Sequence, residues 1–66
     1  IFVNLSLVVM MNKYQDKDGN QYYVYEYNSI LGVWRIEKIG EQGFKETDKH
    51  GADSFIAENQ LTVVEE

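Results

Sequence analysis

The sequence contains no cysteine, no proline and only one histidine, and acidic residues outnumber basic ones. The absence of cysteine excludes disulfide bonds and thiolate metal sites, and the single histidine, His50, excludes a histidine-rich zinc site. Because no proline occurs, no candidate strand is ruled out on that ground. Six basic and eleven acidic residues give a net charge of −5, which argues against direct binding to nucleic acid or to an anionic membrane surface.

The chain is short, and its 66 residues provide for one small domain, which we take to span 1–66. Hydrophobic residues make up 44% and charged residues 26% of the sequence, a balance typical of a folded domain. A domain of this size buries only about 60% of the surface that its unfolded chain exposes, so its core is marginal. With disulfides and such metal sites excluded, burial against another chain is the remaining source of stability. We therefore expect a homodimer.

The first eleven residues are mostly apolar, with only Asn4 and Ser6 as exceptions. A membrane-spanning helix needs about 20 such residues, and a signal peptide has a basic start and a small-residue cleavage site that are missing here. Apolar residues occupy every odd position from Val3 to Met11, which predicts a half-buried first strand. The adjacent Met10 and Met11 leave open that residues 1–10 are an upstream extension instead.

Residues 15–20 form the clearest turn signal, because an Asp-Gly pair between two β-rich runs is typical of a hairpin. The spacing of Asp16, Asp18 and Asn20 also resembles the start of a calcium-binding loop. A calcium loop has glycine at its sixth position and glutamate at its twelfth. Here the glycine is fourth and the twelfth residue is Tyr27, so we reject the calcium site.

Residues 21–27 are predicted to form a tyrosine-rich strand. Alternation along this strand places its side chains on two faces, with Tyr23, Tyr25 and Tyr27 on one and Tyr22, Val24 and Glu26 on the other. The row of three tyrosines offers rigid contact area with polar tips, as protein-binding surfaces often do. The alternative is that the row covers an apolar sheet face, with its hydroxyl groups reaching water.

The rest of the chain is predicted to contain short strands and one short helix. In order, we expect a strand at 33–39, a turn at 40–43, a short edge strand at 44–47, a polar loop at 48–51, a helix at 52–59 and a last strand at 61–64. In the strand at 33–39, alternation places Trp34, Ile36 and Lys38 on one face and Arg35 and Glu37 on the other.

Catalytic motifs are nearly absent. Four residues of the types that a catalytic triad uses lie close in sequence, namely Asp48, His50, Asp53 and Ser54. A polar loop, however, rarely fixes the geometry of a triad. Glu37 and Glu41 could form an acid pair, yet so small a chain leaves little room for a closed pocket. We predict a non-enzyme that uses no metal and no cofactor.

Two architectures are compatible with these elements. The first is an α+β, mainly β fold in which a small antiparallel sheet carries one short helix and the chain forms a dimer. The second is an SH3-like five-stranded barrel, in which residues 51–61 form the short turn into the last strand.

The sequence Gln-Asp-Lys-Asp-Gly-Asn-Gln-Tyr-Tyr-Val-Tyr at 15–25 resembles the hairpin of the small uracil-DNA glycosylase inhibitors of phi29-like Bacillus phages. That family has Gln-Asp-x-Asp-Gly-x-Gln-Tyr-Tyr-x-Tyr at the corresponding place. Small size, acidity, absence of cysteine and a small sheet with a helix also fit. The specific part of the resemblance covers about eleven residues. Beyond Gly40 no match remains, apart from an Ala-Asp pair at 52–53.

The resemblance implies a dimeric DNA mimic that occupies the DNA-binding cleft of a host uracil-DNA glycosylase, in the cytoplasm of an infected bacterium. An ungapped carry-over places Trp34 at the family's aromatic residue, which helps to capture the apolar residue that the enzyme wedges into DNA. Glu26 and Glu37 are the nearest acids that could stand in for phosphates. The family has an acid directly after the aromatic residue, whereas this chain has Arg35.

Two other functional hypotheses remain open. An SH3-like interaction module would use Tyr23, Tyr25, Tyr27 and Trp34 as an aromatic groove for an extended peptide. A structural subunit of a larger assembly would explain the apolar first residues. Ionic strength separates the first two hypotheses, because only a DNA mimic should associate much more slowly at high salt.

Overall fold

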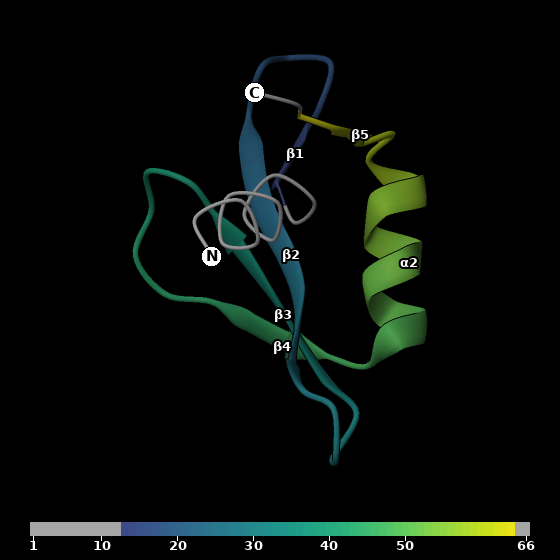
Figure 1. The fold of residues 1–66 in the computed structure, drawn as a ribbon. Coiled ribbons are helices and arrows are strands. Elements are labelled where there is room, and N and C mark those ends of the chain that lie inside the picture. Colours follow the sequence, from purple (N-terminus) through teal and green to yellow (C-terminus); the bar gives the residue numbers. More distant parts are fainter. Residues whose placement is uncertain (1–12, 65–66) are drawn as a thin grey trace, which may run out of the picture.

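A computed structural model describes residues 13–64, which form an antiparallel sheet with one helix across one of its faces (Figure 1). The elements are β1 (Lys13–Gln15), β2 (Gln21–Asn28), β3 (Val33–Lys38), β4 (Lys45–Thr47), α2 (Lys49–Glu58) and β5 (Thr62–Val63). The strand order is β4-β3-β2-β1-β5. The predicted α+β, mainly β fold with one short helix is thus confirmed for this part of the chain. The strand predicted within residues 1–11 lies outside the described residues.

The β1–β2 hairpin forms where the Asp-Gly pair predicted it. The backbone N–H of Gly19 donates to the carbonyl of Asp16 (3.1 Å), and Gly19 takes a positive φ of 89°. The Asp16 carboxylate accepts hydrogen bonds from the backbone N–H groups of Asp18 and Asn20, each at 2.9 Å. These contacts are local in sequence, because a left-handed glycine closes a short hairpin loop at little steric cost.

The β2–β3 ribbon is the longest pairing in the sheet and runs from Tyr22 opposite Lys38 to Glu26 opposite Trp34. An irregularity between Glu26 and Asn28 shifts the register before the strands join. The hairpin then extends away from α2, and its connection lies beyond the end of the helix (Figure 1).

The core lies between α2 and the sheet, where Val24, Ile36 and Ala52 are buried. Partly buried apolar side chains surround this cluster, namely Tyr14, Tyr22, Trp34, Phe55 and Ile56. The rings of Tyr22 and Phe55 meet edge to face, with their centroids 5.4 Å apart. Alternation along β2 and β3 therefore directs the even-numbered side chains toward the helix.

The helix begins earlier than the sequence predicted. Residues 52–59 were expected to be helical and 48–51 to be a polar loop, but α2 already begins at Lys49. Asp48 caps it by accepting the backbone N–H of Gly51 at 2.8 Å. Gly51 suggested a loop, but a Cβ at this position would lie 1.8 Å from Thr47 Oγ1, so close packing requires glycine inside the first turn.

The described residues fit an open sheet better than the SH3-like barrel. In that alternative 51–61 was the short turn into the last strand, whereas most of it is helix. The strands β4 and β5 lie at opposite edges of the sheet and do not pair with each other within residues 13–64.

Candidate functional site

The sheet face opposite α2 carries the predicted row of tyrosines. We call this surface the tyrosine face, and it comprises Tyr23, Tyr25, Tyr27, Arg35, Glu37, Phe44 and Glu46. Because the helix covers the even-numbered positions of β2, the three odd-numbered tyrosines are left on the other side. Tyr27 is the most open of them, with 53% of its surface exposed.

A hydrogen bond joins two predicted site residues on the tyrosine face. The hydroxyl of Tyr25 on β2 donates to the Glu37 carboxylate on β3. This bond, together with partial burial and the negative charge of Glu37, raises the pKa of Tyr25 above its usual value. Tyr25 therefore stays neutral at physiological pH and holds the Glu37 carboxylate in one position.

Arg35 forms the second fixed group of the tyrosine face. Its guanidinium carbon lies 3.4 Å from the ring centroid of Tyr27 and 3.9 Å from that of Phe44. Its Nε donates to Glu46 on β4 at 2.9 Å. Stacking against two rings together with a carboxylate contact is the geometry in which arginine differs most from lysine.

Partial burial acts to lower the pKa of Arg35, but the hydrogen bond to Glu46 and nearby negative charge raise it overall, so the guanidinium remains charged. In the sequence, Arg35 directly follows Trp34, the predicted aromatic contact, and no partner for Arg35 was predicted. Its contact with Phe44 and Glu46 depends on the β3–β4 register, which pairs Arg35 with Glu46.

Trp34 lies on the opposite side of the sheet from the tyrosines. Its ring packs against the core cluster, and Lys49 Nζ lies 5.4 Å from the ring centroid. Glu26, its cross-strand partner, is exposed on the same side as Trp34. The structure thus brings Tyr23, Tyr25, Tyr27 and Glu37 together, but it separates them from Trp34 and Glu26. A joint aromatic groove of Trp34 with the tyrosines is not formed, because strand parity places them on different faces.

The tip of the β2–β3 hairpin carries two exposed apolar side chains that sequence reasoning missed. We call residues 28–32 the hairpin tip; Ile30 is 92% exposed and Leu31 is 74% exposed. Asn28 Oδ1 accepts the backbone N–H groups of both residues, at 3.0 and 3.1 Å. The signal in the sequence was a pair of turn residues, Asn28 and Gly32, on either side of two apolar residues. This pattern indicates a turn that exposes apolar side chains at its centre.

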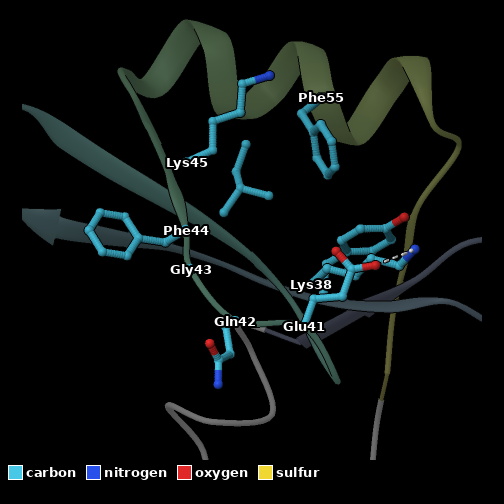
Figure 2. A pocket seen from close by; sticks show the side chains of 9 residues that line it. Lys38, Glu41, Gln42, Gly43, Phe44, Lys45 and Phe55 are labelled. Carbon is cyan, nitrogen blue, oxygen red and sulfur yellow. Dashed lines mark ion pairs between the residues drawn. The ribbon is translucent and has the colours of Figure 1, made fainter.

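A hollow of about 310 Å³ opens between α2, the sheet and the connection from β3 to β4. We call it the helix-side pocket. Tyr22, Ile36 and Phe55 supply its apolar lining, and Figure 2 shows Phe55 directed from the helix toward the sheet. The charged residues around it are Lys38, Glu41 and Lys45, and Lys38 pairs with Glu41 at 3.4 Å.

Two of the residues considered for catalysis, Asp48 and Asp53, make structural contacts at the start of α2. Asp48 caps α2, and Lys49 holds Asp53 one turn later at 2.9 Å. Within residues 13–64, no group of three or more histidine, aspartate or glutamate side chains is gathered for a metal ion. None of the helices in that same range is long and apolar enough to cross a membrane.

Comparisons of the chain with protein family models, with curated proteins and with solved structures give no match.

Proposed function

We propose that this protein is a non-enzymatic inhibitor that binds a bacterial uracil-DNA glycosylase and occupies its DNA-binding cleft. The proposal starts from the resemblance of residues 15–25 to the phage inhibitors. The observation that carries it further is the fixed carboxylate of Glu37 within the tyrosine row. Such an inhibitor would act in the cytoplasm of an infected bacterium.

A DNA mimic needs carboxylates held in fixed positions in place of phosphates, and the hydrogen bond from Tyr25 supports Glu37 for this role. Its partner, the Tyr25 hydroxyl, is uncharged, so the hydrogen bond orients the carboxylate without neutralising it. A carboxylate that is already ordered loses less freedom on binding than a mobile one. On the same face, Arg35 and Glu46 pair with each other and cancel in charge. Glu37 is then the acid that a basic cleft would meet.

The aromatic part of the contact falls to Tyr27 in this proposal. Trp34 was the expected anchor, but its packing against the core leaves less of it for a partner. Tyr27 is half exposed, and Arg35 stacks on its ring at 3.4 Å. Aromatic residues and arginine are the side chains that most often dominate binding energy at protein interfaces.

The test is titration of the purified chain into a uracil-DNA glycosylase assay with a uracil-containing oligonucleotide. Stoichiometric inhibition is expected, and Glu37→Gln should weaken it at least about tenfold. Glu58→Gln is the matched control, because Glu58 lies at the end of α2 and outside the tyrosine face. No inhibition at a large molar excess would refute the proposal.

Trp34 needs a separate variant, because Trp34→Ala removes a ring that packs against the core. Trp34→Phe keeps an apolar ring there. If both variants inhibit normally while they stay folded by circular dichroism, Trp34 has no part in binding. If the Trp34→Ala variant is folded and is the only one of the two that does not inhibit, Trp34 is the anchor that the resemblance implies.

A second candidate is a protein-interaction module that binds an extended peptide on the tyrosine face. The observation that favours it is the row of tyrosines on a side of the sheet that no element within residues 13–64 covers, with Tyr27 53% exposed. Association by this route should change little with ionic strength, whereas a DNA mimic should associate more slowly as salt rises.

A further inference from the structure

We propose that two copies of this chain form a two-fold dimer in which the hairpin tip of each copy enters the helix-side pocket of the other. This inference does not depend on the glycosylase hypothesis. It rests on an exposed apolar tip and an apolar hollow that occur on the same molecule.

The tip has the properties of an inserting element. Ile30 and Leu31 are the two most exposed large apolar residues in the described part of the chain, at 92% and 74%. Their turn is already fixed by the two hydrogen bonds to Asn28 Oδ1, and Gly32 supplies the positive φ of 70° that returns the chain to β3. A preformed turn avoids much of the ordering cost of binding.

The helix-side pocket has the matching properties. Its volume of about 310 Å³ is at the lower end of pockets that hold small apolar groups. Tyr22, Ile36 and Phe55 provide an apolar lining for aliphatic side chains.

The tip of a chain cannot reach its own pocket. Tyr22 and Lys38 pair at one end of the β2–β3 ribbon and line the pocket, whereas the hairpin tip begins with Asn28 at the other end. Six residues of strand separate Tyr22 from Asn28, which corresponds to about 20 Å. A hairpin tip that fills this pocket therefore belongs to a second molecule.

The same separation makes the exchange reciprocal. When two β2–β3 ribbons lie antiparallel, each tip comes to the pocket end of the other. Both contacts are then equivalent, and the assembly closes at two copies. Contact through only one tip would leave a tip and a pocket free and would extend into a filament.

The charges near the two surfaces are complementary. Glu26 is exposed on the helix side of β2, close to the tip. The charged residues that line the pocket are two lysines and one glutamate, which gives a local charge of +1 in a chain of net charge −5. The Lys38–Glu41 pair leaves Lys45 as the cation that would face Glu26 of the second copy.

Sedimentation equilibrium of the full chain tests the proposal. The mass should rise from 7.7 kDa toward two chains as concentration increases. The Ile30→Ser/Leu31→Ser variant should remain at one chain. Its melting temperature should match that of the wild-type chain at dilutions where the wild type is monomeric, because both side chains are exposed in the single chain. Val63→Ser is the matched control, since Val63 is also half exposed but lies on β5, and it should dimerise normally.

Charge reversal provides a second test that does not alter the tip. Glu26→Lys and Lys45→Glu should each weaken dimerisation, and the double variant should restore it at least in part. The proposal is overturned if the wild-type chain stays monomeric up to about 1 mM. It is also overturned if the tip variant dimerises as well as the wild type, or if mass increases beyond two chains without a plateau.

Discussion

Replacement of Val24 by alanine tests the core most directly. Val24 lies at the centre of β2, is 1% exposed, and contacts the cluster with Ile36 and Ala52. The change removes two buried carbon groups, which costs about 1.6 kcal/mol in transfer free energy at ~0.8 kcal/mol each. The cavity left behind adds roughly 1 kcal/mol, because the surrounding side chains relax only in part. The expected loss in the free energy of unfolding is therefore about 2–3 kcal/mol.

This loss is large for so small a domain. At about 0.05–0.15 kcal/mol per residue, a chain of this length has a total stability of roughly 3–10 kcal/mol. With a urea m-value of ~1 kcal/mol/M, the unfolding midpoint should fall by about 2–3 M. The melting temperature should fall by roughly 10–20 °C.

The matched control is Val63→Ala, the same substitution on an edge strand where the valine is 50% exposed. It should cost less than about 1 kcal/mol, because half of the side chain already contacts water and no closed cavity forms. Both variants are measured by urea unfolding followed by circular dichroism. Equal losses in the two variants would refute the assignment of the core to the helix side of the sheet.

Three further predictions concern hydrogen bonds and ionisation. Asp48→Ala should destabilise the chain by about 1 kcal/mol in thermal unfolding, because Gly51 N–H loses its capping acceptor. For Asp16, partial desolvation acts to raise the pKa, but hydrogen bonds from Asn20 and neighbouring N–H groups outweigh it and lower the pKa below 3.8. The free energy of unfolding should therefore fall as the pH drops below that value. Asp16→Asn should reduce this acid sensitivity in urea titrations. The hydrogen bond to Glu37 raises the pKa of Tyr25 above 10.0, so the stabilisation from this bond is present below pH 10 and is lost at higher pH. An absorbance titration should show that Tyr25 ionises late, and Glu37→Gln should bring its pKa back toward the usual value.

The parts of the fold that depend on local sequence could be predicted. The β1–β2 turn needs only an aspartate that accepts neighbouring N–H groups and a glycine with positive φ, and both lie within 16–20. The division of β2 into two faces follows from alternation alone. The helix was predicted but its start was not, because Gly51 suggested a loop and its packing against Thr47 is not visible in the sequence.

The parts that depend on distant contacts could not be predicted. Tyrosines occur on both faces of β2, so the sequence alone did not indicate which face the helix would cover. That choice follows from the β2–β3 register, which places Ile36 opposite Val24 and Arg35 opposite Tyr25. Trp34 was assigned to binding both through the resemblance and as part of an aromatic groove with the tyrosines, and neither argument contains information about its contacts with the core.

Strand parity has a consequence for how stability and binding are separated in this chain. Val24 and Tyr25 are adjacent, yet one contacts the helix-side core and the other holds Glu37 on the tyrosine face. A substitution at 24 should therefore change the midpoint of unfolding, whereas Tyr25→Phe should mainly change partner binding, because the ring is kept and only the hydroxyl is lost. Sheets with one solvated face allow this division because successive side chains point to opposite sides. Trp34 is the exception: it packs against the core and is also the expected anchor, so its variants must be measured for folding and binding together.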